Sequence, residues 1–208
     1  MSGIRSLASL KKNITGTVRY NDTSFIFTIF PNPHKKTETE QSDIIRLFGN
    51  RIQKDTRCLN ITEEEVQQNI RNKNYTALIY VKNVEIDDTA TGALQYWNWC
   101  DKNTSNRQLW INDLCRVNNS TIHNTSPTSP TSPILILFDI IKKFSLEKHI
   151  NSNYLMVETE KPSTSKLIEI YTKYDFRVDD TCTQEGNIIM KRSLRNSGGT
   201  RKTRKHTK

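Results

Sequence analysis

A carboxylate and a thiol stand close together near the middle of the chain, within a strand-like run over residues 107–117. The run contains Asn112, Asp113 and Cys115. A carboxylate near the end of a strand could act as a general base, or it could be an ordinary solvated residue. Cys115 has no histidine nearby in the sequence to activate it, so a buried structural thiol is favoured over a nucleophile.

The cysteines do not show the spacing of a metal site. The four cysteines are scattered, which predicts reduced structural thiols rather than disulfides. The three tryptophans lie on two adjacent expected strands, where they could line a pocket or pack the sheet against a helix, and packing is favoured. These residues are Cys58, Cys100, Cys115, Cys182, Trp97, Trp99 and Trp110.

Strands and helices alternate around this central run. The hydrophobic periodicity predicts the order β-α-α-β-β-β-α-β-α-β-β, with Thr62 and Glu65 forming a capping box at one helix start. Such an order indicates an α/β fold with a mixed sheet of about six or seven strands flanked by helices. The expected strands cover 25–30, 75–81, 93–100, 107–117, 153–159, 176–178 and 187–191, and the helices cover 38–54, a short segment from 62, 134–149 and 163–174.

The segment over residues 167–176 resembles the late helix of the GNAT superfamily of N-acetyltransferases. Tyr171 takes the position of the family's tyrosine, and Phe176 takes that of the phenylalanine that opens the next strand. Asp175 stands where glycine is usual, and aspartate can adopt the left-handed conformation that such a helix exit needs. The order of strands and helices is also similar to that of this family.

The resemblance implies an acetyl-CoA-dependent N-acetyltransferase, in which a primary amine of unknown identity attacks the thioester directly. It gives Tyr171 the role of the acid that protonates the departing thiolate. The amine must also lose a proton, and Asp113 is the best-placed candidate for the base. Tyr171 also lies on the apolar face of its expected helix, so an ordinary core role remains an alternative.

The expected cofactor residues lie at the end of the central strand and at two helix starts. The strand resembles the one that pairs with acetyl-CoA through its backbone. The following loop, 118–133, departs from the family because it has no glycine and contains a threefold Thr-Ser-Pro repeat. It is either a modified cofactor loop or an insertion into a site that no longer binds cofactor. The expected contacts are Leu114, Cys115, Val117, Thr131, Ser132, Ile134 and Thr164.

Charge and composition divide the chain into three parts. Residues 1–22 are expected to be a flexible segment, 23–194 a GNAT-like domain, and 195–208 a disordered basic tail. Eight of the nine net positive charges come from the residues after Met190, so the body is almost neutral. The tail could contact nucleic acid, act as a localisation signal, or only keep the protein soluble. The competing function is a catalytically inactive GNAT-like module that binds partners through this tail.

The Gly-Gly and Arg/Lys-rich tail looks like the C-terminal tails of many proteins of large DNA viruses of algae and amoebae. Together with the composition rich in Asn, Ile and Lys, this implies a viral protein located in the host cytoplasm or the virion. No apolar run approaches the ~20 residues of a membrane-spanning helix. Residues 1–12 show no apolar stretch typical of a signal peptide, so we expect a protein that is not secreted.

Overall fold

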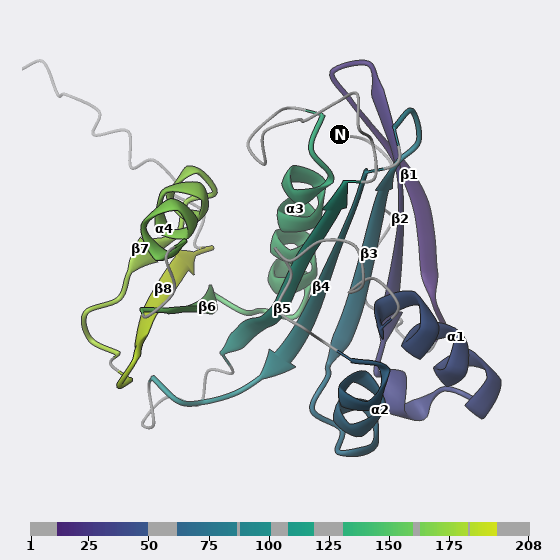
Figure 1. The fold of residues 1–208 in the computed structure, drawn as a ribbon, viewed down its shortest axis with the longest axis horizontal. Helices are drawn as coiled ribbons and strands as arrows, with labels where there is room; N and C mark the ends of the chain where they lie inside the picture. The colour runs from purple at the N-terminus through teal and green to yellow at the C-terminus, as the bar shows by residue number, and fades with distance from the viewer. Residues whose placement is uncertain are drawn as a thin grey trace, which may run out of the picture.

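A single mixed sheet organises the molecule, with its eight strands in the order β1-β2-β3-β4-β5-β6-β8-β7. The computed structural model (Figure 1) describes residues 12–49, 62–86, 88–100, 108–118, 131–159, 163–182 and 184–194. Most of the expected cofactor loop and the whole basic tail lie outside these described residues. The α/β class and the mixed sheet are therefore confirmed, with one or two strands more than expected.

The first five strands pair antiparallel with their sequence neighbours. In β2, side chains at alternate positions enter the core, as a strand that is half-buried requires. The residues of β2 on that face are Thr23, Phe25, Phe27, Ile29 and Pro31. The strands are β1 (Ile14–Tyr20), β2 (Thr23–Pro31), β3 (Ala77–Asn83), β4 (Asp88–Tyr96) and β5 (Leu109–Asn118).

Strand β1 corrects the expectation of a flexible segment for residues 14–20, whereas residues 1–11 lie outside the described residues. Its residues pair with β2 across a tight turn in which Asn21 and Asp22 both have positive φ angles, of 45° and 64°. Turns of this kind suit a two-residue hairpin connection. Val18 is the one buried residue of β1, because the strand lies at the sheet edge. Because only one side chain of β1 is buried, its sequence lacks the alternation of apolar and polar residues from which a strand is predicted.

Strand β4 begins earlier than expected. Its first residues are polar, which indicated a turn, but the structure buries them. The sequence predicted a strand over 93–100 and no strand between residues 81 and 93. The structure instead starts β4 at Asp88 and ends it at Tyr96. Asp88 is fully buried and forms an ion pair with Arg116 of β5. Polarity was therefore a misleading sign of exposure in this strand.

The last three strands form an arm that diverges from β5 (Figure 1). Parallel pairing between β5 and β6 involves Leu109–Ile111 and Asn153–Leu155 only. Beyond these residues β6 continues along β8, which also pairs with the short β7. The strands are β6 (Ser152–Glu158), β7 (Arg177–Val178) and β8 (Asn187–Ser193).

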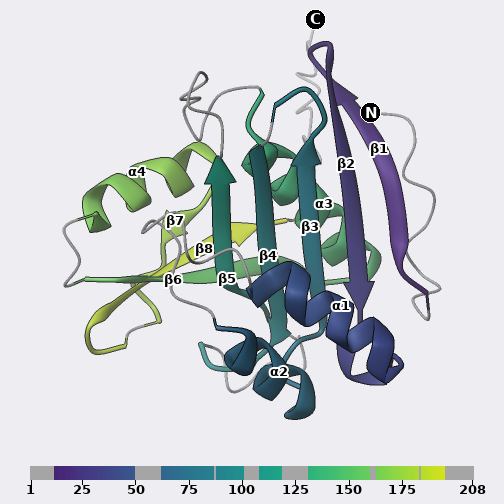
Figure 2. The same cartoon turned by 45° about the vertical axis from the view of Figure 1, so that its right-hand side comes forward.

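Helices cover both faces of the sheet, and Figure 2 shows α1 in front of the central strands with α3 behind them. The smaller core lies under α1 and α2, whereas the larger core includes side chains of α3 and α4. No helix among the described residues is long and apolar enough to cross a membrane. The helices are η1 (Pro33–Lys35), α1 (Glu38–Gly49), α2 (Glu63–Arg71), α3 (Pro133–Glu147) and α4 (Thr164–Lys173).

Two local predictions for helix ends are confirmed. The Thr62 side chain accepts a hydrogen bond from the Glu65 backbone, and the Glu65 side chain accepts one from the Thr62 backbone, which completes the capping box. At the end of α4, Asp175 has a φ of 68° and provides the left-handed exit where glycine is usual.

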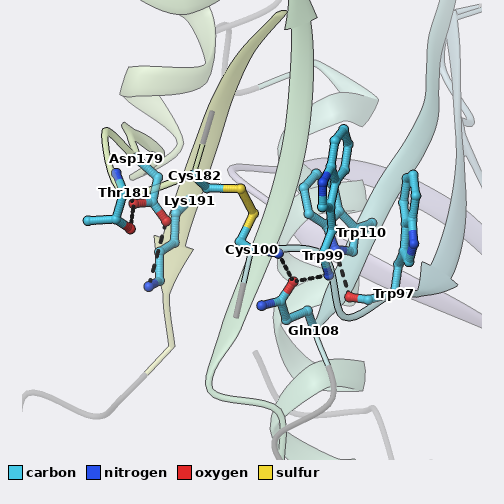
Figure 3. The surroundings of a disulfide bond; sticks show 9 residues. All are labelled: Trp97, Trp99, Cys100, Gln108, Trp110, Asp179, Thr181, Cys182 and Lys191. Atoms are coloured by element: carbon cyan, nitrogen blue, oxygen red, sulfur yellow. Dashed lines mark hydrogen bonds and ion pairs between the residues drawn. A yellow bond between two sulfur atoms is a disulfide. The ribbon is translucent and has the colours of Figure 1, made fainter. Parts of the chain in front are cut away.

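The three cysteines in the described part of the chain are oxidised, so the prediction of reduced thiols was wrong for them. A disulfide joins Cys100, after β4, to Cys182, before β8, across a sequence separation of 82 residues (Figure 3). Cys115 is also disulfide-bonded. Scattered spacing could not reveal the Cys100–Cys182 bond, because the sheet, and not local sequence, brings its two ends together.

Candidate functional site

The point where β5 and β6 separate leaves one edge of β5 without a neighbouring strand. β5 pairs with β4 along its length to Asn118, but its pairing with β6 ends at Ile111. Among the described residues, no other strand takes the place of β6 beyond this point. The strand edge is therefore a place where an extended ligand could meet backbone N–H and C=O groups.

A β-bulge in β5 decides which side chains face each side of this edge. Asp113 pairs with Ala93 and Ile111 pairs with Leu94, so Asn112 is an extra residue without an opposite partner. A bulge reverses the alternation of side chains after it. Ile111 lies in the larger core beside α3, and without the bulge Asp113 would face the same way. With the bulge, Asp113 points to the face that carries α1 and α2.

Asp113 is held by a side chain from outside its own strand. The Tyr75 hydroxyl donates a hydrogen bond of 2.8 Å to Oδ2 of Asp113. Burial raises the pKa of Asp113 above its ordinary value, while the bond from Tyr75 opposes this shift and the charge of Glu65 adds to it. Asp113 is thus a partly desolvated carboxylate, which is a suitable environment for a base.

Tyr171 occupies the other face of the sheet, in surroundings made of aromatic rings. Its ring packs edge-on against Phe138 of α3 and against Phe176, with centroid distances of 6.4 Å in both cases. Burial alone raises the pKa of Tyr171 to about 12. Within the described part of the chain its hydroxyl makes no hydrogen bond. The side chain therefore stays protonated at neutral pH and retains its proton to donate.

The start of α3 lies beside the same end of the sheet. Asn83, the last residue of β3, donates a hydrogen bond of 3.0 Å to the carbonyl oxygen of Thr131. Ser132 is the N-cap residue, but its side chain makes no capping bond. Its Oγ atom is fully buried and has no hydrogen-bond partner in the part of the chain that the structure describes. A buried hydroxyl without a partner is uncommon and calls for an explanation.

The other expected cofactor residues near β5 could contribute through their backbone. Leu114 packs against the larger core, Cys115 and Val117 form a small buried cluster, and the side chain of Ile134, in the first turn of α3, is buried in the larger core. These side chains contact other core side chains, so a contact with the cofactor through the backbone of this segment stays a prediction.

Thr164 is separated from these residues by the diverging arm. Its hydroxyl donates a hydrogen bond of 2.6 Å to the carbonyl oxygen of Glu158, the last residue of β6. The β6 residues paired with β5 lie at the opposite end of that strand. The structure thus uses Thr164 to attach α4 to β6 and does not bring it to the edge of β5.

An ion pair that the sequence analysis missed lies at the end of β5. Arg116 binds both carboxylate oxygens of Asp88, with Nη2 at 2.6 Å from Oδ2 and Nε at 3.0 Å from Oδ1. Burial raises the pKa of Tyr174, at the end of α4, to about 12, and the charge of Arg116 opposes that shift. This electrostatic link places the end of α4 near the end of β5. Nothing in the local sequence distinguished Asp88 from the acidic residues beside it, because the ion pair depends on the pairing of β4 with β5.

The tryptophans gather around the Cys100–Cys182 disulfide, and Figure 3 shows their indole rings side by side. Trp97 and Trp99 lie beyond the end of β4, with ring centroids 4.8 Å apart. The ring centroid of Trp110 lies 5.7 Å from that of Trp97, and the Nε1 atom of Trp110 donates a hydrogen bond to the Trp97 backbone carbonyl oxygen. This cluster packs on the sheet against Tyr154, Ile189 and the disulfide, and not against a helix as the sequence favoured, and Trp97 remains 43% exposed.

Comparison with solved structures shows that the chain has the fold of GNAT-family acetyltransferases. A GNAT-family acetyltransferase from Listeria monocytogenes superposes with a TM-score of 0.51 at 9% identity, covering 86% of this chain and 99% of its own. The ribosomal-protein-S18-alanine N-acetyltransferase from Escherichia coli gives 0.44 at 12% identity, covering 91% and 98%. The yncA protein from Salmonella typhimurium, solved with its cofactor acetyl-CoA, gives 0.46 at 8%, covering 83% and 96%. No protein-family model and no curated protein matches the sequence.

Proposed function

We propose that this protein is an acetyl-CoA-dependent N-acetyltransferase that acts on a primary amine. The observation that carries the proposal is the separation of β6 from β5 after Ile111, which leaves a strand edge next to the start of α3. This feature occurs in a chain with the GNAT fold. A candidate base and a candidate acid approach the sheet from its two faces.

The residues at the start of α3 fit the phosphates of acetyl-CoA. The N-terminus of a helix attracts anions through free backbone N–H groups and the helix dipole. α3 has 15 residues and no acidic residue in its first turn, and the buried Ser132 hydroxyl has a donor to offer. Ser132 and the backbone of the first helical turn would hold the phosphates. The β5 edge from Leu114 to Val117 would bind the extended part of the cofactor.

Proton transfer is then divided between the two side chains. Bound acetyl-CoA supplies an acetyl group activated as a thioester. Asp113 takes a proton from the amine through Oδ1, the oxygen that Tyr75 leaves available. Tyr171, with its pKa raised to about 12, holds a proton at neutral pH and donates it to the leaving thiolate.

Isothermal titration with acetyl-CoA tests the cofactor site. We expect micromolar binding to the wild-type protein, weakened about tenfold or more in a Ser132→Ala variant because a hydrogen bond to a charged group is lost. Ser163→Ala is the matched control, since Ser163 is the N-cap of α4 and also makes no side-chain capping bond. It should bind like the wild type.

Three outcomes separate the competing functions. Binding followed by acetylation of an amine in a panel of primary amines supports the enzyme. Binding without transfer to any amine favours the inactive binding module. Absence of binding at millimolar acetyl-CoA overturns the acetyltransferase proposal and directs attention to the basic tail.

A further inference from the structure

We infer that Tyr75, Asn69 and Asn74 are positioning residues that fix the orientation of Asp113 and keep it ready to accept a proton. This inference rests on the proposed function, in which Asp113 is the base. The three residues lie at and just beyond the C-terminal end of α2, whereas Asp113 lies 38 residues after Tyr75 on β5.

The four side chains form a continuous chain of hydrogen bonds. Nδ2 of Asn74 donates to Oδ1 of Asn69 at 2.8 Å. Nδ2 of Asn69 donates to the Tyr75 hydroxyl oxygen at 3.1 Å. The Tyr75 hydroxyl donates to Oδ2 of Asp113 at 2.8 Å. Asn69 and Tyr75 thus each receive a hydrogen bond from one neighbour and donate one to the next.

The direction of this chain follows from its chemistry. The Asn74 side chain donates to the side-chain oxygen Oδ1 of Asn69, so the Asn69 side-chain NH₂ group must face Tyr75. Because that amide donates to the phenol oxygen, the phenol hydrogen is left to point at Asp113. A phenol that accepts one hydrogen bond also becomes a stronger donor in the next. The chain therefore delivers a hydrogen to Oδ2 and leaves Oδ1 for the amine.

The backbone after α2 is built to hold this arrangement. Lys73 has a φ of 59°, in the left-handed region, which turns the chain back along the helix. The Asn74 backbone N–H then bonds to the Asn69 carbonyl oxygen at 2.9 Å. Tyr75 is only 2% exposed, and its ring packs in the smaller core with Val66 and Ile70. The phenol consequently has little freedom to turn away from Asp113.

Without this chain Asp113 would be poorly suited to its role. Burial and the charge of Glu65, from α2, both raise its pKa, and the bond from Tyr75 is the influence that lowers it. These two residues, from the segments packed against Asp113, are the titratable groups that act on it. A bond that stabilises the carboxylate keeps Asp113 deprotonated at a lower pH.

Two conservative variants test the inference by titration of the Asp113 carboxyl carbon in NMR, assigned with Asp113→Asn. Tyr75→Phe removes the donor and keeps the ring. Asn69→Asp keeps the shape but offers a carboxylate that attracts the phenol hydrogen away from Asp113. Both should raise the pKa of Asp113 by about one pH unit. Asn72→Asp adds the same charge at the exposed C-cap of α2 and should leave that pKa unchanged.

The titration requires no substrate, so it is independent of the proposed reaction. If both variants raise the pKa and acetyl transfer is never detected, the positioning of Asp113 stands and the proposed function fails. If the protein acetylates amines but neither variant moves the pKa, or Asn72→Asp moves it equally, the inference is overturned. In an active enzyme, the acidic limb of the kcat/KM profile should shift upward in both variants with the KM for acetyl-CoA unchanged.

Discussion

The two groups proposed to move protons are held in opposite ways. Asp113 is the end of a hydrogen-bonded chain that reaches it from α2, on one face of the sheet. Tyr171 lies on the other face among the rings of Phe138 and Phe176, where no described residue bonds to its hydroxyl. One side chain is surrounded by directed polar contacts and the other by apolar surfaces.

This difference reflects the charge that each role requires. A base must be charged before the reaction, and a buried charge is costly unless hydrogen bonds stabilise it. An acid such as tyrosine must be neutral before the reaction, and burial alone favours the neutral form. The same physical effect, desolvation, therefore opposes the proposed role of Asp113 and supports that of Tyr171.

The largest expected effect is the loss of the base. Asp113→Asn keeps an oxygen that can accept the Tyr75 hydrogen bond but removes the group that takes the proton. We expect kcat/KM for acetyl transfer at neutral pH to fall by about 10³ to 10⁴-fold, with acetyl-CoA affinity unchanged. Steady-state kinetics and isothermal titration measure the two quantities.

Asp179→Asn is a suitable control for that variant. Asp179 is bonded to Thr181 and paired with Lys191 near the disulfide (Figure 3), so its loss should not affect the rate. A wild-type rate in Asp113→Asn would show that another group accepts the proton. The contrast between Asp113 as base and Tyr171 as acid would then no longer hold.

A smaller effect is expected from the loss of the acid. Tyr171→Phe preserves the aromatic packing and removes only the hydroxyl, so kcat should fall by about 10²-fold while cofactor binding is retained. Tyr174→Phe is the matched control, because Tyr174 is also buried near Phe138 and has its pKa raised to about 12. Equal losses in the two variants would indicate a packing effect instead of acid catalysis.

The smallest effect concerns stability and separates the two groups by pH. Both have folded-state pKa values raised above the unfolded values. Each therefore favours the folded state below its unfolded pKa and loses this contribution as pH rises through the folded pKa. For Asp113 the loss begins near pH ~3.9, and for Tyr171 it lies between about 10 and 12.

Thermal unfolding across pH can test this separation. The melting temperature should fall as pH rises through each folded-state pKa, and Asp113→Asn should flatten this fall in the acidic range only. Tyr171→Phe should flatten it at alkaline pH only. A single variant that changes both limbs would mean that the two environments are coupled, contrary to the comparison.

The fold was largely predictable where periodicity and local chemistry agree. The capping box of α2 and the left-handed exit at Asp175 depend on neighbouring residues, so the sequence contains all that is needed. The start of β4 was not predictable in this way, because Asp88 is buried only through its pairing with Arg116, 28 residues later. Strand β1 was missed because Val18 is its one buried side chain.

The roles assigned to site residues from the sequence stay predictions, and the orientation of these residues was not predictable. Asp113 and Tyr171 were both identified, one from its place in the strand and one from a family resemblance. The bulge at Asn112, which turns Asp113 to the face of α2, depends on pairing with β4 and leaves no local signal. Tyr75 was predicted only as part of a strand, and its contact with Asp113 requires the folded sheet.

The disulfide between Cys100 and Cys182 has a consequence for the unfolded chain. It closes a ring that contains β5, α3, β6 and α4, and so both Asp113 and Tyr171. For a separation of 82 residues, loop-closure entropy corresponds to a stabilisation of about 4.5 kcal/mol at 25 °C. Reduction would return that conformational freedom to the half of the molecule that carries the proposed chemistry, while β1, β2 and β3 lie outside the ring. We therefore expect loss of the Cys100–Cys182 bond to open this half of the chain to proteases more readily than β1, β2 and β3.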